Sequence, residues 1–148
     1  MTIRQNALKG YWLVNVLIDT NVILDVLCNR TDFVEASAAV LKYCEVKEIQ
    51  GYVSALSFPN IVYIMRKELT NEKIKEIINT LSLILTVADL KASDLKKAAD
   101  LDFNDFEDAL QAVCASKVQA QYIVTRNIKD FQNSKIPAIK PAELLERL

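Results

Sequence analysis

The sequence contains no histidine, and this absence removes whole classes of catalytic site. Without an imidazole there is no Ser-His or Cys-His dyad, no histidine general base and no histidine-containing metal site. Any chemistry must therefore use carboxylates, amides, hydroxyls, lysine or arginine. Glycine and proline are also scarce, with two and three residues among 148, while 51% of the residues are hydrophobic. This composition predicts one well-packed soluble domain over residues 1–148.

Cysteines and long apolar runs are also few. Cys28, Cys44 and Cys114 are odd in number, widely spaced and set in apolar surroundings, which predicts reduced core cysteines rather than disulfides or a zinc site. No apolar run reaches the roughly 18 to 20 residues of a membrane helix. Residues 1–10 lack the apolar block and cleavage site of a secretory signal. We therefore expect a cytoplasmic protein with no membrane span, and interpret residues 1–12 as an N-terminal extension.

A broad basic surface is excluded by the charge balance. Lysine and arginine total 18 and the acids total 19, which gives a net charge of −1. A protein that binds nucleic acid mainly by electrostatics carries a strong positive field. A polyanion could therefore be held only by a local basic patch or by a bridging metal ion.

Short apolar runs rich in β-branched residues alternate with helical patterns along the chain. Strands are predicted at residues 13–19, 52–56, 83–87 and 122–125, with a possible fifth near 137–139. Helices are predicted at residues 22–27, 33–47, 60–68, 72–81, 93–101, 106–120 and 141–148. This alternation is typical of βαβ units and predicts a single three-layer α/β/α domain with a central parallel sheet of four or five strands.

Several residues are suited to the ends of these elements. Thr31 or Asp32 can cap the helix over residues 33–47, and Thr70 or Asn71 can cap the one over 72–81. Ser57 and Pro59 fit the opening turn of the helix over residues 60–68. Gly51 is expected to close the unit before the second strand.

Acidic side chains follow two of the predicted strands and open one helix. Asp19 comes directly after the first strand, and Asp130 lies a few residues after the fourth. The stretch "DFNDFEDAL" places Asp105 and Asp108 on one helical face, with Glu107 expected to point elsewhere. Ligands gather at the carboxyl ends of such strands, and crowded carboxylates favour a neutralising cation. Oxygen ligands without thiolate or imidazole select Mg²⁺ or Mn²⁺, so a divalent-metal site is predicted.

Each acid also has a purely structural interpretation. Asp19 can cap the helix that begins near Thr20. Asn104 and Glu107 have the spacing of a capping box, and acids in a first helical turn are favoured by the helix dipole.

Three motifs in order carry a family resemblance: "LIDTNVILDVL", "DFEDALQAVCA" and "YIVTRNIKDF". Together they closely resemble the PIN-domain ribonucleases, particularly the VapC-like toxins of type II toxin–antitoxin pairs, from about Val16 to the C-terminus. The resemblance implies a Mg²⁺- or Mn²⁺-dependent endoribonuclease that hydrolyses RNA to 5′-phosphate and 3′-hydroxyl ends. It also implies a homodimer and a small cognate antitoxin whose segment lies across the acidic groove.

The resemblance also implies roles for particular acids. The first acid of the family falls on Asp19 and the helix-opening acid on Asp108, with Asp105 as an assisting neighbour. The late acidic position falls in "TRNIKDF", where Asn127 stands at a site that often holds aspartate and Asp130 offers a carboxylate three positions on. We therefore expect Asp19, Asp108 and Asp130 to hold the metal.

The family's acid in the helix after the second strand aligns with Asn60. An amide oxygen can bind Mg²⁺ but brings no charge, so weaker metal affinity is expected. Glu68 lies two helical turns further on and is interpreted as exposed. Supporting polar roles fall to Thr20, Asn21, Asn60, Thr125 and Asn127, with Thr125 orienting an acid rather than attacking. The basic residues that could contact the RNA backbone are Arg66, Lys67, Arg126 and Lys129.

Two other functions fit parts of the pattern. A HAD-like phosphatase also has Asp after its first strand, but it needs a second Asp where this chain has Asn21. The stronger alternative is a PIN fold that has lost catalysis and acts as an RNA- or protein-binding module, with Asn60 and Asn127 as the visible losses. A saturable response to Mg²⁺ separates an active site from an inactive one.

Overall fold

The strands form one parallel sheet of five, in the order β3-β2-β1-β4-β5, in a computed structural model that describes residues 14–148. Every neighbouring pair is parallel. The predicted N-terminal extension and the start of the first predicted strand lie outside the described residues. The strands are β1 (Asn15–Ile18), β2 (Gln50–Ser54), β3 (Thr86–Ala88), β4 (Tyr122–Val124) and β5 (Ala138–Ile139). The fifth strand and the parallel sheet are thus confirmed.

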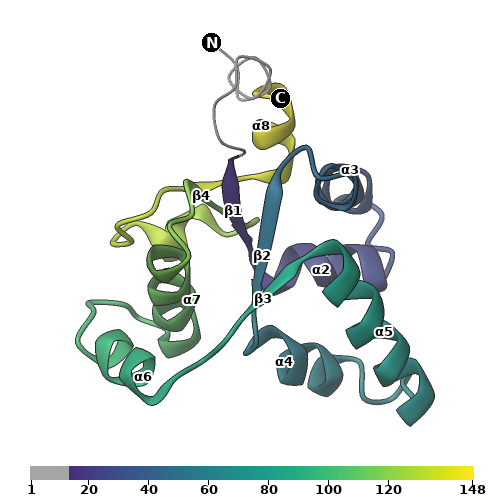
Figure 1. Cartoon of the computed structure of the whole chain (residues 1–148), viewed down its shortest axis with the longest axis horizontal. Coiled ribbons are helices and arrows are strands. Elements are labelled where there is room, and N and C mark those ends of the chain that lie inside the picture. Colours follow the sequence, from purple (N-terminus) through teal and green to yellow (C-terminus); the bar gives the residue numbers. More distant parts are fainter. Residues whose placement is uncertain (1–13) are drawn as a thin grey trace.

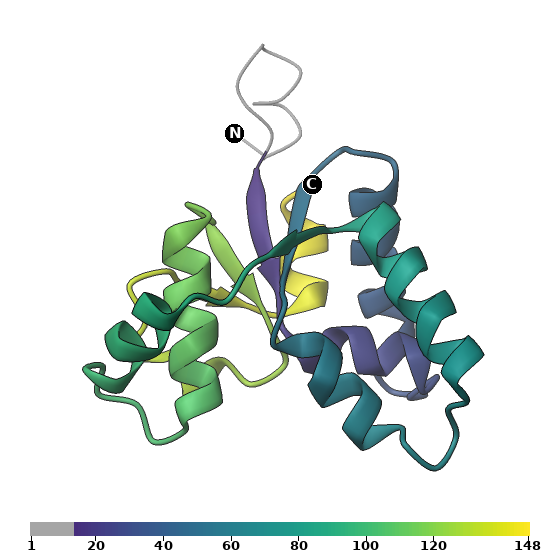
Figure 2. The ribbon, with the colours of Figure 1, turned by 60° about the horizontal axis from the view of Figure 1, so that its bottom comes forward.

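Helices cover both faces of the sheet, as expected for three layers (Figures 1 and 2). On one side lie α2 (Thr20–Leu27), α3 (Val34–Glu45), α4 (Ser57–Ile64), α5 (Asn71–Ile84) and α8 (Pro141–Glu146). On the other lie α6 (Ala92–Ala99), α7 (Phe106–Lys117) and the short 3-10 helix η1 (Ile128–Phe131). Within residues 14–148, no helix is both long enough and apolar enough to cross a membrane.

The central strand β1 is buried on both faces. Val16 and Ile18 pack into the core shared with α2 and α3, whereas Leu17 points the other way and packs against Cys114 of α7. All three strand residues are fully buried. Two covered faces explain why this strand reads as a continuous apolar run instead of an alternating one.

The strand order places a topological switch beside β1. From β1 the chain moves outward through β2 and β3, and then returns to pair β4 on the opposite side of β1. In open parallel sheets the connections leave in opposite directions at such a point, and a crevice forms at the carboxyl ends of the strands. Asp19 immediately follows β1 at this edge.

The predicted start of the third strand and the predicted caps of α3 are wrong. The third strand begins at Thr86 instead of residue 83, because α5 continues to Ile84 and the backbone N–H of Leu85 still bonds to the carbonyl of Leu81. A short apolar run at a helix end has no periodicity that separates it from a buried strand. Helix α3 begins at Val34 without a side-chain cap, so neither Thr31 nor Asp32 fills that role.

Of the other predicted details at the ends of helices and strands, some are confirmed and some are wrong. Ser57 and Pro59 lie in the first turn of α4, and Thr70 caps α5 by accepting a bond from the Lys73 N–H at 3.2 Å, as predicted. Helix α4 ends at Ile64, earlier than expected. Gly51 lies inside β2 instead of closing the preceding unit.

The glycine and the cysteines are explained by packing. A Cβ on Gly51 would come within 2.6 Å of the Cys44 Sγ, so the strand approaches α3 too closely for a side chain. Cys44 and Cys114 are buried free thiols, as predicted, and burial raises their pKa values to about 12 and about 11. Cys28 is exposed at the end of α2, so its predicted place in the core is wrong.

Candidate active site

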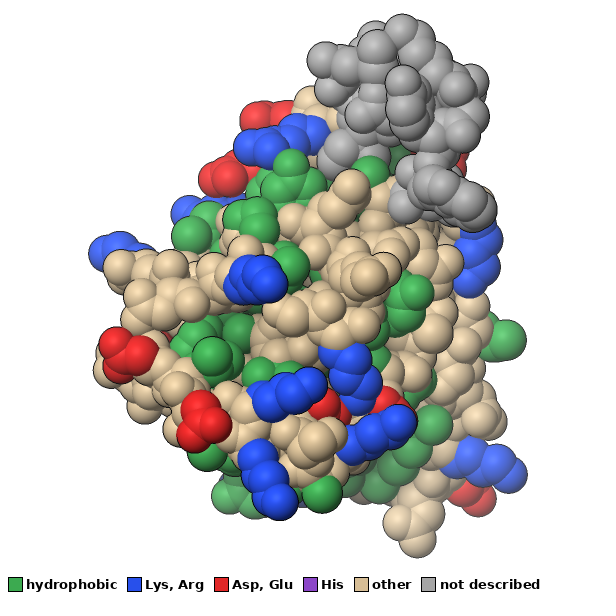
Figure 3. All heavy atoms as spheres, turned by 60° about the vertical axis from the view of Figure 1, so that its left-hand side comes forward, with side chains coloured by type: hydrophobic (Ala, Val, Ile, Leu, Met, Phe, Trp, Pro, Cys, Tyr) green, Lys and Arg blue, Asp and Glu red, His purple; other side chains and the backbone are tan. Residues whose placement is uncertain are grey.

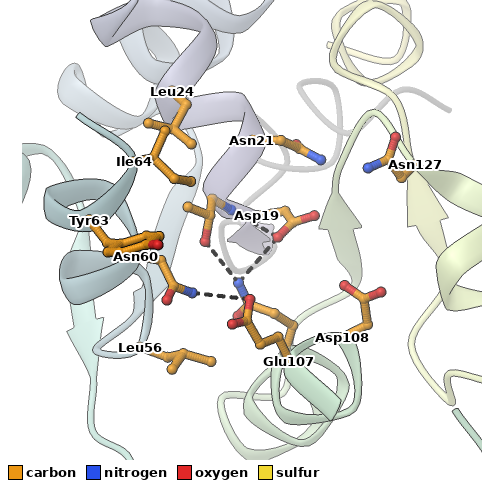
Figure 4. Close-up of a pocket in the computed structure, with 12 residues that line it drawn as sticks. Asp19, Asn21, Leu24, Leu56, Asn60, Tyr63, Ile64, Glu107, Asp108 and Asn127 are labelled. Atoms are coloured by element: carbon orange, nitrogen blue, oxygen red, sulfur yellow. Dashed lines mark hydrogen bonds between the residues drawn. The ribbon is translucent and has the colours of Figure 1, made fainter. Parts of the chain in front are cut away.

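A cleft of about 400 Å³ opens at the carboxyl ends of β1 and β2 (Figure 4). Helices α2 and α4 contribute to its lining on one side, and the first turns of α7 contribute on the other. Its polar lining consists of Asp19, Thr20, Asn21, Asn60, Glu107, Asp108, Gln111 and Asn127. The fold therefore gathers side chains from four separate parts of the sequence.

Asp19 is the most firmly held carboxylate in this cleft. It caps α2, with Oδ1 accepting the Thr20 N–H at 2.8 Å and Nε2 of Gln111 at 3.2 Å. Oδ2 accepts the hydroxyl of Thr125 at 2.8 Å. Burial raises the pKa of Asp19, and nearby Asp130 raises it further, against the lowering effect of these hydrogen bonds. Capping and a functional role are therefore compatible in this residue.

The polar residues around Thr125 hold the start of the loop after β4. Thr125 is fully buried and accepts bonds from the Asn127 N–H at 3.1 Å and from Nδ2 of Asn21 at 3.4 Å. Asn21 also accepts the Arg126 N–H at 3.5 Å. This geometry agrees with the predicted orienting role of Thr125 toward Asp19.

Gln111 belongs to the same network and was not singled out from the sequence. Its side chain is 3% exposed, and Nε2 also lies 3.5 Å from both Thr20 Oγ1 and Ser57 Oγ. Thr20 and Ser57 share a hydrogen bond of 2.8 Å. Within the described chain, the Oε1 atom of Gln111 is buried without a partner. The available signal was its spacing, since it follows Asp108 by three positions and so shares a helical face with it.

Asp108 lies in the first turn of α7 and is half-buried. Burial, followed by the charges of Asp105, Asp19, Asp130 and Glu107, raises its pKa to about 7. Without a cation, this carboxyl is therefore partly protonated at neutral pH. A bound cation would favour its ionised form.

The cap of α7 is Asp105, whose Oδ1 accepts the Asp108 N–H at 3.0 Å. The predicted capping box of Asn104 and Glu107 is therefore wrong, because Asp105 has the extended backbone of a cap and lies directly before the first helical residue. Glu107 turns toward the cleft, contrary to expectation, and its Oε2 accepts Nδ2 of Asn60 at 3.3 Å.

Asp130 lies in a second, adjoining hollow of about 260 Å³, which it shares with Asp105, Asp108 and Lys129. Asp19 does not line that hollow, so Asp108 is the carboxylate common to both. Across residues 14–148, no three acidic or cysteine side chains are close enough together to hold one metal ion. The predicted metal-binding acids are thus neighbours that do not form a closed ligand shell.

The four basic residues expected to contact RNA differ in how they interact with the rest of the protein. Nε of Arg126 donates to Oδ2 of the buried Asp25 at 2.8 Å, and its guanidinium lies 4.1 Å from the centre of the Phe33 ring. Arg66 donates to the Tyr63 carbonyl at 2.7 Å and stacks over that ring. The side chains of Lys67 and Lys129 are exposed, and Lys129 borders the adjoining hollow.

The donor set fits a divalent cation. The cleft offers carboxylate oxygens from Asp19 and Asp108 and neutral oxygens from amides and hydroxyls. Mg²⁺ prefers oxygen ligands and usually keeps several waters, so it does not need a complete protein cage. Asp19, Asp108 and water could together hold such an ion.

The chain is similar to known proteins along most of its length. It is 26% identical over 136 residues to ribonuclease VapC1 of Aquifex aeolicus (strain VF5), a match that covers 89% of this chain and 94% of that protein. VapBC2 from Rickettsia felis, bound to a DNA fragment from its promoter, has a TM-score of 0.66 at 17% identity, and the match covers 86% of this chain and 98% of that one. A toxin–antitoxin complex from Klebsiella pneumoniae has a TM-score of 0.64 at 18% identity, with 85% and 97% covered.

The two solved structures are only 17% and 18% identical to this chain, so the similarity to them supports a common fold and no more. The family itself is shown by a separate match, in which residues 15–129 match the model of the PIN domain. That range takes in β1 with Asp19, the Asn60 helix, and α7 with Asp108. The chain therefore belongs to the PIN-domain family.

Proposed function

We propose that this protein is a divalent-metal-dependent endoribonuclease and the toxin of a toxin–antitoxin pair. Membership of the PIN-domain family and the similarity to ribonuclease VapC1 support the nuclease activity. The observation that carries the proposal is the cleft in which Asp19 and Asp108 face neutral oxygen donors at the switch point of the sheet. Mg²⁺ or Mn²⁺ is the proposed cofactor.

The proposed ligands of the cation are Asp19 and Asp108. Asp130, in the adjoining hollow that Asp108 also lines, is the third proposed ligand. When bound, the cation lowers the pKa of the attacking water and neutralises charge that develops on the phosphate. Thr125 and Gln111 hold the two oxygens of Asp19 in fixed directions. Asp105 keeps the first turn of α7 in place and so fixes Asp108.

The RNA backbone would be bound by exposed cations at the rim of the site. Lys129 borders the hollow that contains Asp130, and Lys67 follows α4 with its side chain exposed. Arg66 reaches the same rim through its stacking on Tyr63, which lines the cleft. Arg126 contributes indirectly, because its guanidinium is paired with Asp25 and stacked on Phe33.

The proposed partners are a small cognate antitoxin and a second copy of this chain. The neighbours in fold include VapBC2 and a toxin–antitoxin complex, which supports an antitoxin partner. Exposed apolar side chains beside the acidic cleft, Tyr63 at 66% and Ile64 at 51%, suit a bound protein segment better than water.

A cleavage assay tests the nuclease proposal. Purified protein is incubated with a mixed RNA pool in Mn²⁺ and, as the control, in excess EDTA. We expect cleavage only with Mn²⁺, and products with 5′-phosphate and 3′-hydroxyl ends. Products ending in 2′,3′-cyclic phosphate, or equal cleavage in EDTA, would contradict hydrolysis assisted by a cation.

The second candidate is a catalytically inactive PIN fold that binds RNA or protein. The amides Asn60 and Asn127 in the cleft, and the lack of a closed acidic shell within residues 14–148, favour it. Titration with Mg²⁺ followed by thermal shift separates the two candidates. An inactive site would give no saturable response below about 10 mM, beyond the weak end of biological affinities for such hard cations.

A further inference from the structure

We propose that a basic hollow beside the cleft binds a backbone phosphate of the RNA, near the phosphodiester that is cut, and that Lys140 is its direct contact. This inference rests on the proposed function, because it takes RNA as the substrate. The hollow measures about 270 Å³ and lies where the start of α3, the loop after β4 and the start of α8 meet. Lys140 directly precedes α8 and lies beyond residues 15–129, which match the PIN-domain model.

Asn127 joins the basic hollow to the cleft. It lines both, and Figure 4 shows it on the opposite side of the cleft from Tyr63. Its N–H donates to Oγ1 of Thr125 at 3.1 Å, and the Thr125 hydroxyl donates to Asp19 at 2.8 Å. An RNA strand that is cut beside Asp19 can therefore continue past Asn127 into the basic hollow.

The charged groups at the basic hollow leave an excess of positive charge. Asp25 is fully buried, and its single carboxylate is shared by Arg126 at 2.8 Å and Arg30 at 3.3 Å, so one positive charge of this group is not neutralised. Lys140 adds another, since its exposed side chain forms no ion pair within the described chain. Asp32 is the opposing charge that lines the hollow. Three cations and two carboxylates give the local basic patch that a polyanion requires in a protein with a net charge of −1.

The two cations that line the basic hollow differ in mobility. Arg126 is held in place, because its Nε is in the ion pair and its guanidinium lies 4.1 Å from the centre of the Phe33 ring. Its charge therefore acts on the hollow from a fixed position. Lys140 has a flexible stem and a compact ammonium group, which can follow a phosphate as a point charge.

The floor of the basic hollow suits a nucleotide better than a free inorganic ion. Phe33 is 41% exposed, and with Ala36 and Pro141 it gives the hollow apolar side chains beside the cations. Sites for single-stranded nucleic acid combine positive charge for the backbone with apolar and aromatic surface for sugars and bases. The hollow has both, next to the proposed site of cleavage.

Fluorescence anisotropy with a short, labelled single-stranded RNA of mixed sequence, in EDTA to prevent cleavage, tests the subsite. We expect Lys140→Gln to weaken RNA binding by about 3- to 5-fold, near the upper end of what an exposed ion pair contributes. A phosphate contact also releases counterions, so the slope of log affinity against log salt should become shallower by about 0.7. The matched control is Lys75→Gln, an exposed residue of α5 outside both the cleft and the hollow, which should keep the wild-type affinity and slope.

Removing the opposing charge should have the reverse effect. Asp32 is exposed and does not cap α3, so Asp32→Asn changes the charge of the basic hollow without removing a structural contact of that helix. We expect this variant to bind the same RNA about 2-fold more tightly, because a like charge no longer repels the phosphate. Unchanged or weaker binding would contradict the charge argument.

The wild-type affinity and slope in Lys140→Gln would overturn the subsite. Weaker binding with an unchanged slope would overturn it too, because the effect would then arise from the structure and not from a phosphate contact. The absence of RNA binding by the wild type in EDTA would also contradict it.

The proposed function fails separately from the subsite. If the wild type cleaves RNA in Mn²⁺ while Lys140→Gln binds RNA as the wild type does, the nuclease stands and the subsite falls. If the wild type does not cleave RNA in Mn²⁺ but Lys140→Gln shows the lower affinity and slope, the hollow binds RNA and the nuclease proposal falls.

Discussion

Asp19 combines two properties that usually oppose each other. It is only 7% exposed, yet its carboxylate accepts hydrogen bonds from Thr20, Gln111 and Thr125. Burial raises its pKa, while these donors favour the ionised form. The hydrogen bonds therefore hold the ionised carboxylate of Asp19 in place, although burial makes its negative charge unfavourable in the metal-free protein. This arrangement is expected where a bound cation neutralises the charge.

Replacing Asp19 with asparagine should stabilise the metal-free protein. The raised pKa of Asp19 means that the folded state holds the carboxyl proton more tightly than the unfolded chain, so the ionised form costs folding free energy at neutral pH. The asparagine side chain can keep the bonds to Thr20 and Gln111 through its amide oxygen and can donate to Thr125. We expect Tm in EDTA to rise by about 2 to 4 °C, the shift that about 1 kcal/mol causes at this size. A lower Tm would mean that hydrogen bonding outweighs burial.

The pH dependence of stability should report Asp108. Its pKa is about 7 in the folded protein and 3.8 as the ordinary value, so between these values the folded state retains a proton that the unfolded chain has lost. Stability in EDTA should therefore fall as pH rises from about 4 to about 7. Urea unfolding across this range measures the slope, which Asp108→Asn should reduce. An unchanged slope in that variant would assign the effect to another group.

Adding an acid at residue 60 should tighten cation binding. Asn60→Asp places a new carboxylate beside Glu107, which lies 3.3 Å from the present amide nitrogen. The added charge should improve Mn²⁺ binding by about 1 to 2 kcal/mol, the size of one charged ligand partly offset by repulsion. The same repulsion should lower Tm in EDTA. Titration calorimetry and thermal melts measure both effects, and unchanged affinity would place residue 60 outside the reach of the ion.

At the scale of elements, α7 carries much of the site. The helix contributes Asp108, Glu107 and Gln111, and Asp105 caps it. The sequence predicted the acid-rich start of this helix and its position before β4, because charge and periodicity are local signals. It did not predict the bond from Gln111 to Asp19, since a contact across 92 positions depends on how α7 packs against β1.

The loop after β4 is held by a buried ion-pair network that the sequence did not reveal. Asp25 is fully buried in α2 and pairs with Arg126 at 2.8 Å and Arg30 at 3.3 Å, while Ser37 donates to it at 3.2 Å. Within the apolar pattern "VILDVL", a single acid would be expected on the exposed face of the helix. Its partners lie in other elements and loops, so only the fold explains its burial.

The network predicts the effect of removing Arg126. Arg126→Ala leaves Asp25 with Arg30 as its remaining cation and frees the loop that carries Thr125 and Asn127. We expect a loss of about 3 kcal/mol in the free energy of unfolding, the lower end of the cost of breaking a buried pair. Urea unfolding measures it, and Lys129→Ala is the exposed control, with little change expected. A variant as stable as the wild type would show that Arg30 suffices.

At the scale of the whole molecule, topology brings the site together and the charge limits how it can bind RNA. The parallel sheet and the position of Asp19 followed from the alternation of strands and helices, whereas the exact ends of α5 and β3 did not. On the side formed by α6 and α7, lysine and arginine side chains lie beside acidic ones (Figure 3). With a net charge of −1, the protein has little overall attraction for a polyanion. A cation in the acidic cleft would remove the main local repulsion.

The most direct test of the central claim is the rate of RNA cleavage in Mn²⁺ by Asp19→Asn, measured beside the wild type and Asp100→Asn. Asp100 is exposed at the end of α6 and does not line the cleft, so its variant controls for the loss of one acidic charge. We expect Asp100→Asn to cleave at the wild-type rate, and Asp19→Asn to be inactive although its fold is intact by circular dichroism. Cleavage by Asp19→Asn at close to the wild-type rate would contradict the account of this cleft as a metal-dependent nuclease site.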